Sequence, residues 1–207
     1  MRLKKGIRIF LTVIAILIVS LFIIWYLFFS DKKVAKKVMV LNNIKEYRYE
    51  LKDSHSKEYK SLFYDLKKIL GKDTVDYKEY ASTIGKMFII DYYSLSDRIA
   101  KTDVGGVCFV HSAAVSNFLE KSENTIYKYL ESNLYGGREQ KLPKVKEVIV
   151  DSVEVNSFEY LDTVDEEAYF VKLHWNYTDV DSSSGYQREA ELVFVHEEKK
   201  LSLVEVR

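Results

Sequence analysis

The longest apolar run of the chain lies near its N-terminus, at residues 9–29, which contain no charged residue and no Asn, Gln, Pro or Gly. At about 1.5 Å per residue this run would be roughly 30 Å long as a helix, which matches the hydrocarbon core of a bilayer. Basic residues precede the run, and Trp25 and Tyr26 lie near its far end, where aromatic side chains suit a membrane interface. The pattern predicts a transmembrane helix at residues 9–29.

A cleavable signal peptide is the alternative, because it also has a basic start and an apolar core. Its core is usually only about 7 to 15 residues long and is followed by small residues. Here the bulky residues 25–29 lead directly into Ser30 and Asp31. We therefore expect an uncleaved anchor in the cell membrane, with residues 1–8 as a short cytoplasmic tail and the rest of the chain outside the cytoplasm.

The pattern after residue 29 predicts a charged helical stalk at residues 30–43, a strand from residue 44 to 51, and a helix at residues 57–70. Ser56 is suited to cap the start of this helix, and Gly71 is placed to end it in a left-handed conformation.

A second helix is expected at residues 75–94, capped by Thr74, with Gly85 in its middle. Residues 107–110 read either as a strand or as a buried turn. Ser112 opens a third helix, in which apolar residues recur at helical spacing as far as Leu130.

From Val145 onward the apolar residues alternate with polar ones, which is typical of half-buried strands. Strands are predicted at residues 144–158, 168–177, 186–196 and 201–206. Their short connections favour an antiparallel meander. The predicted fold class is α+β: about three helices packed on one face of a curved antiparallel sheet, forming one domain over residues 44–207.

The charge distribution argues against a nucleic-acid partner. The formal net charge is zero, and every acidic residue lies after residue 30, so the predicted domain is net acidic. The single cysteine, Cys108, excludes an intramolecular disulfide and reads as a small buried apolar residue.

The order of anchor, stalk, helices and C-terminal sheet resembles the nuclear-transport-factor-2-like (cystatin-like) domains of bitopic assembly subunits from conjugative and type IV secretion machines. The residues nearest to a motif are 88–93, Phe-Ile-Ile-Asp-Tyr-Tyr, which lead into the helix that begins at Ser112. The resemblance extends over residues 44–207 and is one of pattern. It implies a non-enzymatic scaffold that oligomerises and contacts other subunits.

Domains of this kind enclose a pocket between helices and sheet, so an enzyme or a ligand-binding domain is the alternative. The pocket candidates are Asp91, Tyr92, His174 and His196. Burial of Asp91 among apolar residues would raise its pKa, whereas pairing with Arg98 would give it a structural role. His174 and His196 could approach each other across the sheet, but no recurring ligand spacing predicts a metal or another cofactor.

The sequence thus predicts a membrane-anchored, non-enzymatic protein-interaction or assembly module of a bacterial envelope machine. Its expected partners are the lipid bilayer, through residues 9–29, other envelope proteins, and further copies of itself. A sensory domain that binds a ligand and, behind it, an envelope enzyme remain the alternatives.

Overall fold

The computed structural model describes residues 5–29, 38–178, 180 and 185–207. The chain divides into two compact units, residues 1–36 and residues 37–207, which are treated separately below. The expected stalk at residues 30–43 lies outside the described residues as far as residue 37, and its last residues form a strand instead of a helix.

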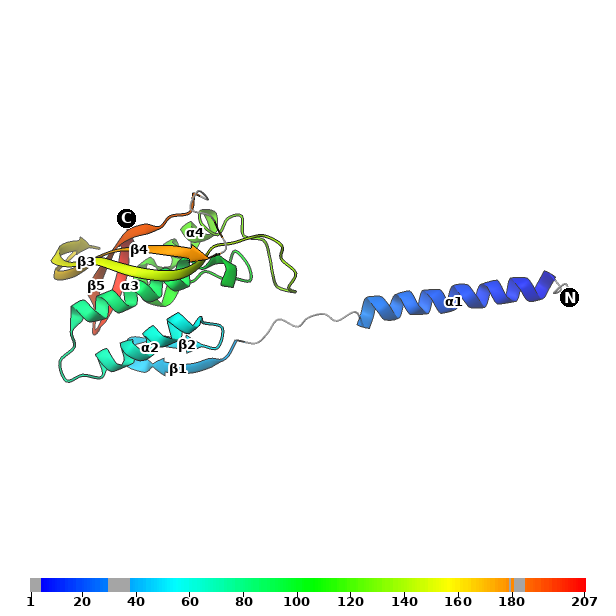
Figure 1. The fold of residues 1–207 in the computed structure, drawn as a ribbon, viewed down its shortest axis with the longest axis horizontal. Helices are drawn as coiled ribbons and strands as arrows, with labels where there is room; N and C mark the ends of the chain where they lie inside the picture. Colours follow the sequence, from blue (N-terminus) through cyan, green and yellow to red (C-terminus); the bar gives the residue numbers. More distant parts are fainter. Residues whose placement is uncertain (1–4, 30–37, 179, 181–184) are drawn as a thin grey trace. The chain divides into compact units, whose positions relative to one another are not determined.

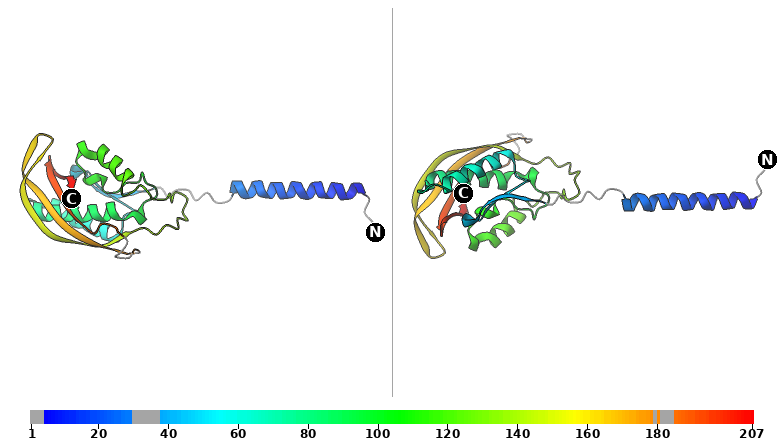
Figure 2. Two further views of the ribbon diagram at one scale, coloured as in Figure 1. Left: turned by 90° about the horizontal axis from the view of Figure 1, so that it is seen from above. Right: turned by 90° about the horizontal axis from the view of Figure 1, so that it is seen from below.

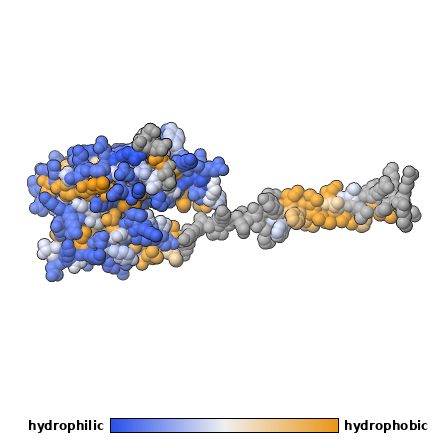
Figure 3. Space-filling model, in the orientation of Figure 1, coloured by the Kyte–Doolittle hydropathy of each residue, from blue (hydrophilic) through white to orange (hydrophobic). Residues whose placement is uncertain are grey.

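The described part of the first unit is the helix α1, Lys5–Phe29. Among the described residues, no helix combines the length and the apolar character needed to cross a membrane, so the predicted transmembrane helix at residues 9–29 is wrong for this part of the chain. Large apolar side chains of α1, such as Ile16 and Phe22, are exposed. Figure 3 shows the hydrophobic colouring of this helix.

The second unit combines helices with an antiparallel sheet, so the predicted α+β class is confirmed (Figure 1). Its elements, in chain order, are β1 (Val40–Ile44), η1 (Lys45–Tyr47), β2 (Tyr49–Lys52), α2 (Lys57–Leu70), α3 (Tyr77–Tyr93), η2 (Leu95–Asp97), η3 (Val107–Phe109), η4 (Ser112–Ala114), α4 (Val115–Asn124), β3 (Lys144–Tyr160), β4 (Thr163–Thr178), β5 (Glu189–Glu197) and β6 (Lys200–Val206).

The main sheet is an antiparallel meander in the order β3-β4-β5-β6. It curves around α3, as both views in Figure 2 show. The curvature has a local cause in the β3–β4 pair, where the register shifts three times. Lys146 and Asp151 are extra residues in β3, whereas the third shift adds a residue to β4, where Glu166 and Glu167 oppose Ser157. Each shift is a bulge that bends its strand and increases the local twist.

The expected single strand at residues 44–51 is a hairpin. β1 and β2 pair antiparallel as a separate two-stranded sheet, and the short helix η1 connects them. Arg48 ends η1 with a φ of 56°, in the left-handed region, and this reverses the chain into β2. Tyr49 and Leu51 of β2 are buried while their neighbours are exposed, which explains the alternation in the sequence.

Two of the predicted helix signals differ from the structure. Ser56 caps α2 as expected, since its hydroxyl accepts a hydrogen bond from the backbone N–H of Tyr59. Gly71, however, has a φ of −90°, so α2 ends without a left-handed residue. The cap of α3 is Asp76 rather than Thr74, because the Asp76 carboxylate accepts from two backbone N–H groups. A third difference is the helix α4, which begins at Val115 after the short helix η4 and ends at Asn124, so the predicted start at Ser112 and the continuation to Leu130 are wrong.

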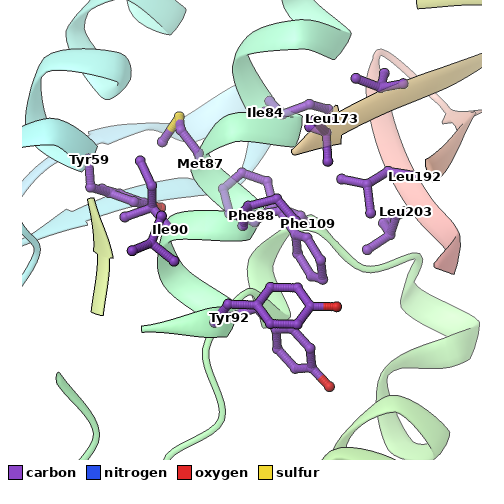
Figure 4. Packing of buried hydrophobic residues seen from close by; sticks show 14 of the residues in the cluster. Tyr59, Ile84, Met87, Phe88, Ile90, Tyr92, Phe109, Leu173, Leu192 and Leu203 are labelled. Carbon is purple, nitrogen blue, oxygen red and sulfur yellow. The ribbon is translucent and has the colours of Figure 1, made fainter. Parts of the chain in front are cut away.

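The core fills the space between α3 and the concave face of the sheet (Figure 4). Ile84 and Phe88 of α3 are fully buried, as are Leu173 and Leu192 of the sheet. Gly85 lies where α3 comes closest to the sheet: a Cβ there would be 3.2 Å from a methyl carbon of Leu173. The missing side chain thus permits this close packing, which offsets the cost of a glycine in a helix.

Candidate functional site

The candidate site is a cleft of about 250 Å³ that contains Asp91, and we call it the Asp91 cleft. One wall is formed by β2 and the turn that leads into α2. The other wall is formed by the end of α3 and by residues 97–108. Its polar lining includes Lys52, His55, Asp91, Arg98 and Asp103.

Asp91 is held by groups from the following loop. Arg98 donates through Nη2 to the Asp91 carboxylate and, at 2.9 Å, to the Asp91 carbonyl oxygen. The backbone N–H of Gly106 donates to the other carboxylate oxygen at 2.7 Å. The side chains of Asp91 and Arg98 are both largely buried. Asp91 therefore ties the loop after α3 to the end of the helix.

Burial opposes ionisation of Asp91, but the positive charge of Arg98 and the Gly106 N–H outweigh it and lower the pKa of the carboxyl group. The charge of Asp91 in turn raises the pKa of Arg98 despite the burial of the guanidinium. Asp91 is thus a permanently charged structural anion. The raised pKa expected from desolvation alone is wrong, and the pairing with Arg98 is confirmed.

The Gly105-Gly106 pair is required by this arrangement. A Cβ on Gly105 would overlap the backbone carbonyl of Asp91, and one on Gly106 would collide with the ring of Phe88. Gly106 also has a φ of 75°, in the region that favours glycine. The two glycines therefore let residues 105 and 106 approach α3 closely enough for Gly106 to donate to Asp91.

His55 and Cys108 line the same cleft, but they do not form a nucleophilic pair. The Nδ1 atom of His55 accepts a hydrogen bond from the backbone N–H of Lys52 at 3.1 Å, and its ring packs on Tyr59. Burial lowers the pKa of His55 to about 4, so the imidazole is neutral at pH 7. Burial raises the pKa of Cys108 to about 12, which leaves the thiol protonated and a poor nucleophile.

Tyr92 lines a different groove, of about 470 Å³, between α4 and the end of β6. Its hydroxyl shares a 3.0 Å hydrogen bond with Ser122, and its carbonyl oxygen accepts from the hydroxyl of Tyr127 at 2.6 Å. The neighbouring residues Asp91 and Tyr92 thus face separate cavities, because they project from different sides of α3.

The structure does not bring His174 and His196 together. His174 lies opposite Glu189 on the sheet and contacts Asp151, with 2.8 Å between Nδ1 and the nearer carboxylate oxygen. His196 contacts Asp165, with 3.0 Å between Nδ1 and the carboxylate. The two histidines belong to separate surface pairs, and among the described residues no three His, Cys, Asp or Glu side chains are grouped as a metal site would require.

Sequence reasoning missed Lys52, His55 and Asp103 as members of the site. His55 lies in the turn before α2. No local pattern connects this turn to Asp91, because the two meet only through the packing of the β2–α2 turn beside the loop after α3. No family model, no curated protein and no solved structure matches this chain.

Proposed function

We propose that the domain is a protein-interaction module. The observation that carries this proposal is a set of large apolar side chains displayed on ordered loops: Ile99, Tyr129, Leu134 and Tyr135, which we call the loop surface. Tyr129 is 77% exposed and Tyr135 is 66% exposed. Large exposed aromatic side chains are costly in water and are enriched where proteins bind one another.

Hydrogen bonds hold the loops of this surface in place. The backbone N–H of Asn133 donates to the carbonyl of Ile99 at 2.7 Å. Arg138 donates to the carbonyls of Ser96 and Arg98, each at 2.8 Å. These contacts join the loop after α4 to the loop after α3.

Gln140 fixes the base of the same loop. Its amide donates to the carbonyl of Tyr129 at 2.9 Å, and its side-chain oxygen accepts from the N–H of Glu131. An exposed apolar surface on a fixed backbone loses little conformational entropy on binding, which favours association. The proposed partner is therefore a protein with a complementary apolar patch. Assembly into a secretion or conjugation machine stays a prediction from the resemblance.

Photocrosslinking in cells tests this proposal. A photoreactive phenylalanine analogue replaces Tyr135 or Tyr129 in the full-length protein, and Tyr64, an exposed tyrosine on α2, provides the matched control. We expect discrete protein adducts from positions 129 and 135 and none from position 64.

A second variant separates specific binding from chance contact. Leu134→Ser, which removes an apolar side chain from the loop surface, should greatly reduce the adducts formed at position 135. Adducts that form equally at position 64, or that persist unchanged in Leu134→Ser, would contradict the proposal, as would the absence of adducts at both loop positions.

A further inference from the structure

The β2 wall of the Asp91 cleft presents a row of alternating charges. Arg48, Glu50 and Lys52 all line the cleft, whereas Tyr49 and Leu51 between them are buried on the opposite side of the strand. Arg48 and Lys52 have no salt-bridge partner within 4.0 Å among the described residues. This wall therefore offers two cationic groups without an ion pair of their own, on either side of Glu50, which also has no ion pair among the described residues.

The other wall offers an acidic group. Asp103 accepts a hydrogen bond from the backbone N–H of Ile99 at 3.0 Å, and its nearest cation, Nη1 of Arg98, is 3.8 Å away. That distance is beyond ordinary hydrogen-bond length, so the carboxylate keeps capacity for another donor. Its side chain is 38% exposed and can be reached from the cleft.

Both walls are fixed without a ligand. On the β2 side, the backbone N–H of Asp53 donates to Met39 O at 2.9 Å, and Lys60 donates to Asp53 O at 2.9 Å. On the other side, the Asp91–Arg98 pair and the Gly106 N–H bond hold the loop. His55 adds a neutral donor, because its Nδ1 is occupied by the Lys52 N–H and its remaining proton is on Nε2.

We propose that the Asp91 cleft binds a small zwitterion, namely a free amino acid or a dipeptide. Asp103 pairs with the ligand's ammonium group, and Lys52 and Arg48 pair with its carboxylate. A simple anion would leave Asp103 unpaired, and a simple cation would leave Lys52 and Arg48 unpaired. A volume of about 250 Å³ is below that of pockets for drug-sized molecules and suits a ligand of this size.

Isothermal titration calorimetry on the full-length protein tests the proposal. The probes are the twenty common amino acids and the dipeptides that each forms with glycine. We expect binding of at least one probe. The same compound should bind at least tenfold more weakly when its amine is acetylated or its carboxylate is amidated, because each change removes one charged hydrogen bond.

Single variants test which residues bind the ammonium group and the carboxylate of the ligand. Asp103→Asn and Lys52→Gln should each weaken binding about tenfold or more, while Lys78→Gln and Glu166→Gln, which change exposed charges elsewhere, should leave it unchanged. Binding that is insensitive to capping or to both cleft variants would overturn the proposal, and so would the absence of heat from every probe. These results do not depend on the crosslinking at positions 129 and 135, so the two proposals can fail separately.

Discussion

Asp91 and Arg98 form a largely buried ion pair in which each partner compensates the other's charge. Compared with an apolar pair of the same shape, such a pair adds little to the free energy of unfolding. The loss of one partner, however, leaves a buried charge without compensation. The C-terminal end of α3 and the loop that follows it are therefore energetically coupled through this pair.

Replacing Asp91 with Asn tests this coupling. Asn keeps an acceptor for the Gly106 N–H but removes the charge facing Arg98, so we expect a loss of about 3 kcal/mol in the free energy of unfolding by urea. Asp97→Asn, which breaks a more exposed pair with Lys144, should cost less than about 1 kcal/mol. Equal losses in the two variants would contradict this assignment.

The lowered pKa of Asp91 also fixes the sign of its pH dependence. A carboxyl group with a lower pKa in the folded state stabilises the fold above its unfolded pKa of about 3.9, and this contribution disappears as the pH falls through the folded value. The difference between the wild type and Asp91→Asn should therefore shrink in strong acid.

His55 should make the fold less stable in mild acid. Its folded pKa of about 4 lies below the ordinary histidine value of 6.5, so the unfolded chain binds the proton more tightly. The contribution of His55 to the free energy of unfolding is complete above pH 6.5 and declines as the pH falls toward 4. The slope should stay below the limit of about 1.4 kcal/mol per pH unit for one proton, because the folded and unfolded states differ by less than one bound proton throughout this range.

Urea unfolding at several pH values between 7.5 and 4.5 measures this slope. His55→Gln, which cannot titrate in this range, should flatten the curve. A wild-type slope that persists in His55→Gln would assign the effect to another group.

At the scale of elements, local patterns predicted most of the fold. Helix α2 and the four strands of the main sheet lie where the periods of 3.6 and 2 indicate them. The errors occur where tertiary contacts override local signals. The pattern left residues 107–110 open between a strand and a buried turn; residues 107–109 form a short helix, and Val110 bridges to Leu203 in parallel. The third helix stops at Asn124, and Tyr127 beyond it is buried against Tyr92.

The β3–β4 hairpin has a two-residue turn with an unfavourable sequence. Tyr160 pairs with Thr163, and the two turn residues, Leu161 and Asp162, both have positive φ values of 49° and 61°. Two-residue turns with positive φ at both positions strongly favour Asn-Gly. Leu161 is 61% exposed, so no packing compensates for its backbone conformation.

The double variant Leu161→Asn/Asp162→Gly should therefore raise the free energy of unfolding by about 0.5 to 1 kcal/mol. Leu161→Ala, which removes the side chain but does not relieve the positive φ, should give no comparable gain. A double variant that is less stable than the wild type in urea would show that Leu161 makes a favourable contribution to the fold.

At the scale of the whole molecule, the candidate site was the part least accessible from sequence. Asp91 was identified because a carboxylate within an apolar helix is unusual, and Arg98 lies close enough in sequence to be named as its partner. Lys52 and His55 lie far before Asp91 in the sequence, and only the packing of the domain brings them into the same cleft as Asp103. The charges of the cleft therefore follow from tertiary structure.

The two tryptophans report on different compact units, since Trp25 lies in α1 and Trp175 in the core of the second unit. Trp175 is 1% exposed and its ring packs against Tyr93 at 4.6 Å between centroids. We expect Trp25→Phe to retain a cooperative fluorescence transition in urea, with emission shifting to longer wavelength. Trp175→Phe should lose this transition, and its persistence there would mean that Trp25 senses unfolding of the second unit.

The two bulges of β3 have a consequence for association between molecules. β3 is an outer strand of the main sheet, and a regular outer strand can pair with a strand from another molecule. The added residues at 146 and 151 interrupt the even spacing of the outward N–H and C=O groups along β3. A strand from a second chain therefore cannot pair with β3 in register over its whole length, and β3 is protected from edge-to-edge association.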